Sequence, residues 1–319
     1  MTPVSLWESG IAPDVAAALA VLVPLGARVQ AGGPVGALTT YRVGGSAAVR
    51  VTVETSADLD LVADSLAVSG LPSLIVGRGS NLLVADRGFR GVAVLLDTAR
   101  FGWVRFDSSN VDAGAAVALP ALARRSVEAA LSGLEWAVGV PGSVGGAVRM
   151  NAGGHGADMA QSLRYATVFD LSAPRGHRLL RKGAPELGLG YRTSTVHSAE
   201  VVTEAGFALN EGDPVVGRAR IAEIVRWRRA NQPGGQNAGS VFQNPPGSSA
   251  GRLIEDTGLK GFRFGTASVS TKHANFIQAD DGGSADDVAR LIELVRSQVL
   301  DRFSVELKTE VKMIGFAES

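Results

Sequence analysis

Two glycine-rich turns are the part of the sequence whose composition points most directly to chemistry. The first is Gly77-Arg78-Gly79-Ser80-Asn81-Leu82, and the second is Gly139-Val140-Pro141-Gly142-Ser143-Val144-Gly145-Gly146. Because glycine lacks a Cβ, such turns let the backbone approach a ligand closely and adopt positive φ. Their amide groups suit a phosphate, and the second turn could also line a flat ring.

Two smaller glycine turns lie in the same half of the chain. They are Tyr41-Arg42-Val43-Gly44-Gly45, which precedes an alternating run at 48–53, and Gly114-Ala115. Glycine supplies 40 of the 319 residues, against about 7% in an average protein. One such turn alone would be an ordinary tight turn, but four turns in one half favour a bound dinucleotide.

The first turn matches the fingerprint of a Rossmann NAD-binding domain only in part. Gly77 and Gly79 follow an apolar strand, but position 82 is Leu instead of a third glycine. No long helix leading to a ribose-binding acid follows. We therefore disfavour a Rossmann domain.

The composition excludes several classes of function. Lys plus Arg and Asp plus Glu both total 31, so the net charge is zero, and nothing asks for a nucleic acid or an anionic membrane as partner. Cysteine is absent, which removes disulfides, thiol nucleophiles and Cys-ligated metals and fits a cytoplasmic protein. With four histidines, a His-rich zinc site is not expected either, so we predict no metal.

The apolar run from Asp14 to Arg28 is the one stretch that resembles a signal or a membrane span. It contains Pro24 and is preceded by Glu8 instead of basic residues. It is too short to cross a bilayer and lacks the charge pattern of a secretory signal. We predict a short N-terminal helix and no membrane association.

The elements that must position the first-half turns alternate between strand and helix. An alternating run at 48–53, a helical stretch at 57–67 and an apolar run at 73–76 predict a βαβ unit. A further helix is predicted from about 120 to 131. This order indicates an α/β domain.

After residue 208 the pattern changes and predicts a separate C-terminal domain. Asp213-Pro214 supplies an N-cap and a first-turn proline for one helix. Ser284 has Asp287 three residues later, which is the spacing of a capping box, and opens another helix. The run 305–313 alternates apolar and polar residues and predicts a closing strand.

Three motifs, in order along the chain, resemble the UDP-N-acetylenolpyruvoylglucosamine reductase (MurB) family. They are Thr40-Tyr41-Arg42-Val43-Gly44-Gly45, Gly77 through Val84, and Gly139 through Gly153, and the resemblance extends from about residue 36 to 316. It implies an FAD-binding domain of the vanillyl-alcohol-oxidase (PCMH) type, built of two α/β lobes, and a C-terminal α/β substrate-binding domain. Many relatives of this fold attach flavin through a His in the first loop; positions 77–82 contain none, so we predict non-covalent FAD.

The resemblance also implies domain boundaries and FAD contacts. An N-terminal helical segment is expected at 1–35, the FAD-binding domain at 36–207 with lobes at about 36–95 and 96–207, and the substrate-binding domain at 208–319. The implied FAD contacts lie in the glycine turns and beside them: Tyr41, Arg42, Val43, Gly44, Gly45, Gly77, Arg78, Gly79, Ser80, Asn81, Leu82, Gly114, Ala115, Gly139, Pro141, Gly142, Ser143, Val144, Gly145, Gly146 and Val148.

The reaction of the family sets the chemistry that the other residues must perform. NADPH reduces the FAD and departs, and a small-molecule substrate, UDP-N-acetylglucosamine enolpyruvate, takes its place. Hydride passes from flavin N5 to C3 of the enolpyruvyl group and a proton reaches C2. The product, UDP-N-acetylmuramate, serves peptidoglycan synthesis and through it cell-wall biogenesis, cell shape and cell division. We expect a cytoplasmic enzyme that acts as a monomer.

Three residues match catalytic positions of the family. Arg192, in Tyr191-Arg192-Thr193-Ser194, matches a carboxylate-binding Arg whose guanidinium would stabilise the enolate as it forms. Ser240, in Gly239-Ser240-Val241-Phe242, matches the proton donor, and Glu310 matches the catalytic Glu. Taken alone, each residue has an ordinary interpretation: a surface Arg, a turn Ser, and a polar residue on the solvated face of a strand.

The resemblance implies substrate contacts and reveals two departures. The family often has Lys before Gln-Pro, where this chain has Asn231-Gln232-Pro233, and often an acid where this chain has Lys308. Arg228 or Arg229 would supply the missing charge for the UDP diphosphate. The signatures at 240–242 and 272–276 resemble the shorter of the two forms of the family. The expected substrate contacts are Asn151, Tyr191, Asn244, His273 and Asn275.

Two other functions remain open at this point. The first is another FAD oxidoreductase of the same fold with a different substrate. The second is a non-catalytic flavin-binding module, which is disfavoured because Arg192, Ser240 and Glu310 are all present.

Overall fold

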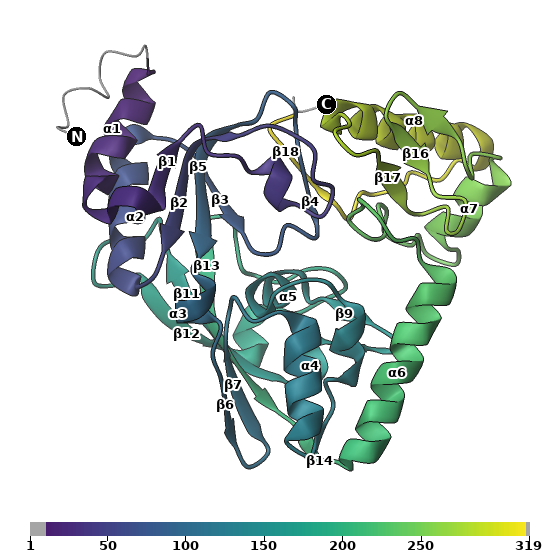
Figure 1. The fold of residues 1–319 in the computed structure, drawn as a ribbon, viewed down its shortest axis with the longest axis horizontal. Helices are drawn as coiled ribbons and strands as arrows, with labels where there is room; N and C mark the ends of the chain where they lie inside the picture. The colour runs from purple at the N-terminus through teal and green to yellow at the C-terminus, as the bar shows by residue number, and fades with distance from the viewer. Residues whose placement is uncertain (1–10, 317–319) are drawn as a thin grey trace. The chain divides into compact units, whose positions relative to one another are not determined.

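A computed structural model describes residues 11–316, which form two compact units. The first unit contains the described residues up to 33, together with 47–77 and 90–221. The second contains 34–46, 78–89 and the described residues from 222 onward. Figure 1 shows the course of the chain through both units. The second unit is thus assembled from two short N-terminal segments and the C-terminal third.

The helices and strands have the following bounds. The helices are α1 (Pro13–Leu22), α2 (Ser56–Ser69), α3 (Thr98–Phe101), α4 (Leu119–Glu128), α5 (Val144–Met150), α6 (Pro214–Asn231), α7 (Ala250–Asp256) and α8 (Ala285–Phe303). The strands are β1 (Val29–Ala31), β2 (Ala47–Val53), β3 (Ser73–Val76), β4 (Leu82–Val84), β5 (Phe89–Leu96), β6 (Val104–Asp107), β7 (Asn110–Gly114), β8 (Leu131–Ser132), β9 (Gly153–Gly154), β10 (Ala157–Asp158), β11 (Leu163–Asp170), β12 (Leu179–Gly183), β13 (Glu200–Ala208), β14 (Asn210–Glu211), β15 (Arg263–Phe264), β16 (Ala267–Val269), β17 (Ile277–Ala279) and β18 (Lys312–Ile314).

The first unit contains a four-stranded and a five-stranded sheet. The four-stranded sheet has the order β1-β2-β5-β3, with α1 and α2 packed against each other beside it (Figure 1). Its core combines Val49, Val51 and Val53 of β2 with Leu59 and Val62 of α2, all fully buried. The five-stranded sheet has the order β12-β11-β13-β7-β6 and its ladders are antiparallel.

The second unit packs α8 against the small antiparallel sheet β15-β16-β17 (Figure 1). Val288, Leu291, Ile292, Val295 and Val299 form the buried face of α8, which is the face that the 3.6-residue spacing predicts. The strands β4 and β18 pair in parallel, so the turn after Gly77 is tied to the C-terminal end of the chain.

The short segment 78–89 is anchored to α8 by Asp86. Its carboxylate accepts hydrogen bonds from the Ser284 hydroxyl (2.5 Å) and from the backbone N–H groups of Ala285 (2.9 Å) and Asp286 (3.2 Å). A carboxylate at these positions satisfies free N–H groups of the first helical turn and interacts favourably with the helix dipole. The sequence around Asp86 shows no sign of this long-range capping.

Most elements predicted from the sequence are confirmed. The strands at 48–53 and 73–76 and the helix at 57–67 correspond to β2, β3 and α2, although β5 lies between β2 and β3 in the sheet. The helix after Asp213 is α6. The predicted N-terminal helix is α1, followed by a 3-10 helix at Val23–Arg28. No helix among the described residues is long and apolar enough to span a membrane.

Two local predictions need correction. Of the run 305–313, strand β18 takes in only Lys312 and Met313; the preceding residues form a single bridge, Thr309 to Phe242, because they lie beside an irregular loop. The capping box at α8 is half made: Ser284 Oγ accepts the Asp287 N–H (3.1 Å), but the Asp287 carboxylate binds Thr266 instead. The predicted domain boundaries stay a prediction.

We predict that Arg178→Ala lowers the free energy of unfolding by about 1–3 kcal/mol. The Arg178 side chain is 8% exposed and bridges Asp60 (2.7 Å) and Asp64 (2.8 Å) of α2, so its loss removes the ion-pair partner of Asp60 and one of the two arginines that contact Asp64. Arg175 also contacts Asp64 (2.9 Å) but is 64% exposed. Arg175→Ala is the matched control and should cost less than about 1 kcal/mol. Equal losses in urea titrations of the two variants would contradict the prediction.

Candidate active site

In the first unit, three of the predicted FAD-binding turns lie side by side. A Cβ placed on Gly77 would come 2.6 Å from Ser143 Oγ, and one on Gly145 would come 3.0 Å from the Ala115 Cβ. The Gly145 N–H donates to the Ala115 carbonyl (2.9 Å). The fold therefore unites residues that are up to seventy positions apart in the sequence into one surface poor in side chains.

In the second unit, the turn at 41–45 contacts the rest of the first glycine turn and the residues that follow it. The Thr40 N–H donates to the Gly79 carbonyl (3.2 Å), and the Gly45 N–H donates to the Ala85 carbonyl (2.9 Å). Gly44 has φ +103° and a Cβ there would lie 2.0 Å from the Val84 carbonyl oxygen. Only glycine fits that position, both for its conformation and for its contact.

The predicted FAD contacts differ in what their side chains offer. Tyr41, Val43, Val144 and Val148 are buried among core residues, so their side chains pack within the protein and only their backbone is available to a ligand. Burial also raises the pKa of the Tyr41 hydroxyl. The side chains of Arg42, Arg78 and Pro141 are exposed. Ser80, Leu82, Gly139 and Gly142 are partly exposed, and Gly114 is buried.

The residues of the glycine turns fit an FAD molecule. Ser143 caps α5 by accepting the Gly146 N–H (3.5 Å), and Gly146 itself is exposed with no side chain to cover its backbone. A Cβ on Gly77 or Gly79 would collide with protein atoms, so these backbones are already at closest approach to their neighbours. A surface of this kind has room for a flat ring and amide groups for a pyrophosphate.

Arg192 lies in a tight turn of the first unit that is held by Asn151. Arg192 has φ +56°, an unusual conformation for a non-glycine residue. Gly190 and Thr193 close the turn by exchanging N–H···O bonds of 3.1 and 3.2 Å. The Asn151 side chain is buried and donates from Nδ2 to the Gly190 carbonyl (2.9 Å) while its Oδ1 accepts the Ala160 N–H (3.0 Å).

The aromatic neighbour of Arg192 is exposed. The Tyr191 ring is 62% exposed, and the Arg192 guanidinium carbon lies 5.4 Å from its centroid. This distance is within the range of a cation–π contact. Tyr191 is therefore available to a ligand, whereas the amide of Asn151 is used to shape the turn.

In the second unit, Ser240 and Glu310 lie on neighbouring segments. The Glu310 N–H donates to the carbonyl of Val241, the residue after Ser240, at 2.7 Å. The Glu310 carbonyl accepts a bond from Asn81 Nδ2 (3.0 Å), which links it to the predicted FAD-binding turn. Among the described residues the Ser240 hydroxyl makes no hydrogen bond, so it is free to meet a substrate.

The three predicted substrate residues of this unit have different surroundings. Asn275 is 3% exposed and both ends of its amide bond the backbone of Phe242. His273 is half-buried and its Nδ1 accepts the Asn275 N–H (3.2 Å). Asn244 is exposed; its Oδ1 accepts the Ala250 N–H (3.0 Å), which leaves the Nδ2 group outward.

Arg228 is a half-buried cation near the C-terminal end of α6. Its Nε donates to Gln232 Oε1 (2.8 Å), and burial lowers the pKa of its guanidinium. No carboxylate within the described part of the chain forms an ion pair with it. Its neighbour Arg229 is exposed, and the Arg229 carbonyl accepts a bond from Lys272 Nζ.

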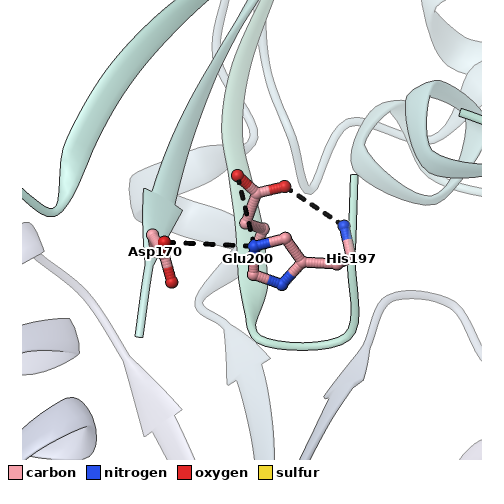
Figure 2. Close-up of side chains that lie close together, drawn as sticks. All are labelled: Asp170, His197 and Glu200. Carbon is pink, nitrogen blue, oxygen red and sulfur yellow. Dashed lines mark hydrogen bonds and ion pairs between the residues drawn. The ribbon is translucent and has the colours of Figure 1, made fainter. Parts of the chain in front are cut away.

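One further cluster has the composition of a metal site but is already satisfied by protein partners. Asp170, His197 and Glu200 point toward one another (Figure 2), with His197 Nε2 at 3.9 Å from Asp170 Oδ2 and 3.7 Å from Glu200 Oε1. Lys182 is ion-paired with the buried Glu200 carboxylate. Burial works to raise the pKa of Asp170, but hydrogen bonds from Ser172 and the nearby His197 outweigh it and lower that pKa. The cluster braces the ends of β11, β12 and β13.

Comparison with known proteins first defines the class of the chain. The family model described as "FAD binding domain" matches residues 47–173, which include Gly77, Ala115 and the turn at 142–146. This match agrees with the surface that those turns form in the first unit. The chain is a flavin-dependent enzyme of the FAD-binding α/β fold, and the predicted fold class and cofactor are confirmed.

The relatives then define the family. The family model of the "UDP-N-acetylenolpyruvoylglucosamine reductase, C-terminal domain" matches residues 231–314. The UDP-N-acetylenolpyruvoylglucosamine reductase of Heliobacterium modesticaldum is 43% identical over 88% of this chain and 89% of its own length. That of Rubrobacter xylanophilus is 39% identical over 88% and 94%.

A solved structure gives the same result. The crystal structure of UDP-N-acetylenolpyruvylglucosamine reductase (MurB) from Thermus caldophilus is 36% identical, with a TM-score of 0.77, and the alignment covers 90% of this chain and 99% of that one. The chain belongs to the UDP-N-acetylenolpyruvoylglucosamine reductase (MurB) family and is an FAD-dependent oxidoreductase. The individual site residues stay predictions, since these comparisons match segments and not side-chain roles.

We predict that acidification destabilises the protein through His273. Burial lowers the pKa of its imidazole below the usual 6.5, and Nδ1 must be unprotonated to accept the Asn275 N–H; nearby Lys260 lowers that pKa further and Glu255 raises it. The unfolded chain therefore binds a proton at a higher pH than the folded one. Stability should fall as the pH drops through about 6.5 and be independent of His273 well above it.

His273→Gln is the test of this pH effect. The variant should show a shallower loss of stability between about pH 7.5 and 5.5 in urea titrations. The lowered carboxyl pKa values of Asp58, Asp170 and Asp287 act in a separate window, because their ordinary value is 3.8. Identical pH profiles for wild type and variant in that range would refute the assignment.

Proposed function

We propose that the protein catalyses the NADPH-dependent reduction of UDP-N-acetylglucosamine enolpyruvate to UDP-N-acetylmuramate, a step of peptidoglycan precursor synthesis. When bound, FAD accepts hydride from NADPH and delivers it to C3 of the enolpyruvyl group. The residues of this chain must then hold the carboxylate, supply a proton to C2 and bind the UDP moiety. The names of the relatives from Heliobacterium modesticaldum and Rubrobacter xylanophilus and of the solved MurB structure support this substrate.

The pairing of the Ser240 and Glu310 segments is the observation that carries the proposal. The two residues are seventy positions apart, yet one hydrogen bond of 2.7 Å joins their segments, and the Ser240 hydroxyl makes no hydrogen bond to any residue from 11 to 316. A serine hydroxyl is a weak acid, so proton transfer from it requires electrostatic help or a proton path. We assign Ser240 as the proton donor and Glu310 as the acid that supports it.

Arg192 and Tyr191 fit a role in orienting the substrate. A guanidinium binds a carboxylate through two parallel hydrogen bonds and stabilises negative charge that develops on it. The positive φ of Arg192 and the bond from Asn151 to Gly190 fix the turn before a substrate arrives. Preorganised charge of this kind acts without further rearrangement at the moment of reaction.

Arg228 is our candidate for the cation that binds the UDP diphosphate. The family Lys is replaced by Asn231, whose Nδ2 donates to the Trp227 carbonyl (2.8 Å). Arg228, one helical turn earlier, is a half-buried cation without a carboxylate partner among the described residues. A partly buried charge is costly unless it is paired, and an anionic ligand would supply the pair.

We further propose a monomeric enzyme that holds FAD non-covalently and acts in the cytoplasm, where nucleotide-activated sugars and NADPH occur. The FAD-binding residues would be the two sets of glycine turns, and the substrate-binding domain would comprise 208–319 as predicted. Asn244 and His273 would contact the substrate through Nδ2 and Nε2, the atoms that their observed bonds leave available.

Ser240→Ala tests the assigned reaction. In anaerobic stopped-flow, NADPH should bleach the flavin absorbance at the wild-type rate, whereas reoxidation by UDP-N-acetylglucosamine enolpyruvate should slow by about 10²–10⁴ because the proton donor is gone. Ser297, exposed on α8, supplies the control: Ser297→Ala should leave both phases unchanged. If wild-type enzyme is reduced by NADPH and the sugar never reoxidises it, the substrate is wrong.

Arg228→Gln should raise the KM for the UDP-sugar by about 10–100-fold, because a charge-assisted contact to the diphosphate is lost. The rate of FAD reduction by NADPH should be unchanged. Arg229→Gln, one residue along and exposed, is the matched control and should change the KM less than about threefold. A larger effect at position 229 than at 228 would reverse the assignment.

A further inference from the structure

Asn275 directs both ends of its amide group to the backbone of the segment that follows Ser240. Its Oδ1 accepts the Phe242 N–H (2.9 Å) and its Nδ2 donates to the Phe242 carbonyl (2.8 Å). Its own carbonyl accepts the Val241 N–H (2.9 Å). These bonds lie where the side chain is 3% exposed, so water does not compete with them.

The opposite edge of the same segment is bonded to the C-terminal part of the chain. The Val241 carbonyl accepts the Glu310 N–H (2.7 Å), and the Gln243 N–H donates to the Lys308 carbonyl (2.9 Å). Phe242 forms a bridge with Thr309 and its ring is 1% exposed in the core of the second unit. The segment is therefore held between Asn275 on one edge and residues 308–310 on the other.

The family motif implies a substrate contact for Asn275, and the structure adds a second role. Both the carbonyl and the NH2 end of its amide bind the Phe242 backbone, and the side chain is 3% exposed. We propose that Asn275 is a positioning residue that sets the direction of the Ser240 hydroxyl relative to Glu310. This inference rests on the proposed role of Ser240 as proton donor.

Asparagine is the side chain that this position requires. Aspartate would keep the bond from the Phe242 N–H but would place a second oxygen against the Phe242 carbonyl, and leucine would leave both Phe242 groups without partners. In either case the Phe242 peptide loses side-chain bonds on one edge while the backbone bonds to Lys308 and Glu310 remain on the other. The resulting shift of the segment displaces the neighbouring Ser240. The bond from Val241 to the Asn275 carbonyl would survive, since it involves only backbone.

A double-mutant cycle in the FAD-loaded enzyme tests the proposal. Asn275→Leu should leave bleaching by NADPH within about twofold of wild type and slow reoxidation by the UDP-enolpyruvyl sugar by about tenfold or more. In a Ser240→Ala background the same change should cost less than about twofold, because the group that it positions is already absent. If Asn275→Leu does not fold, Asn275→Asp is tested with the same expected pattern.

Asp287→Ala provides the control for stability alone. It removes two hydrogen bonds to Thr266 (2.9 Å each) in the same unit, so it should lower the Tm and leave both flavin phases unchanged. Equal slowing of the two phases by the Asn275 variants, or equal slowing in the presence and absence of Ser240, would overturn the positioning role. If Ser240→Ala alone reoxidises at the wild-type rate, the proposed function fails first, and the cycle identifies that failure separately.

Discussion

The hydrogen bonds around the Val241–Phe242 peptides are the constraint on which the chemistry of the second unit depends. Asn275 binds one edge of this segment and residues 308–310 bind the other, and Asn81 attaches Glu310 to the glycine turn at 78–82. Each buried backbone group that lost its partner would cost about 1–3 kcal/mol. Three distant parts of the chain can therefore meet in only one register, which sets Ser240 beside Glu310.

In the first unit, the loop that carries Arg192 is likewise held by a buried asparagine side chain. Asn151, like Asn275, is 3% exposed, and it satisfies one backbone acceptor at Gly190 and one donor at Ala160. An amide is suited to this task because it carries both a donor and an acceptor and no charge, so burying it does not incur the penalty of burying an ion. In each unit a neutral buried amide thus holds the loop of one candidate catalytic residue, Arg192 in the first and Ser240 in the second.

The glycine turns and the candidate arginines suit two different ligands, the cofactor and the substrate. The turns at Gly77, 114–115 and 142–146 present backbone with few side chains, which suits the flat and phosphate-bearing cofactor. Recognition of the anionic substrate instead needs localised charge, and the candidates for it, Arg192 and Arg228, lie outside the glycine turns. A net charge of zero for the whole chain is compatible with this, because the anion is met by individual guanidinium groups and not by an overall positive surface.

The amino-acid sequence by itself determined the class of protein and the local elements. Hydrophobic patterns predicted β2, β3 and α2, capping signals predicted the starts of α6 and α8, and the glycine motifs indicated FAD and the MurB family, because these features depend on residues close together in the chain. The sequence also marked Arg192, Ser240 and Glu310 as candidates by their motifs.

Only the tertiary structure decided which groups meet and what each one is free to do. Residues 34–46 and 78–89 belong to the same unit as the C-terminal third. The strand expected at 305–313 begins only at Lys312. The Asp287 carboxylate binds Thr266 instead of the backbone of the N-cap residue Ser284. The tertiary structure also showed that both ends of the Asn275 amide bind the backbone of Phe242. These outcomes depend on hydrogen bonds between residues tens to hundreds of positions apart, and no local pattern records which distant partner will satisfy a polar group on burial.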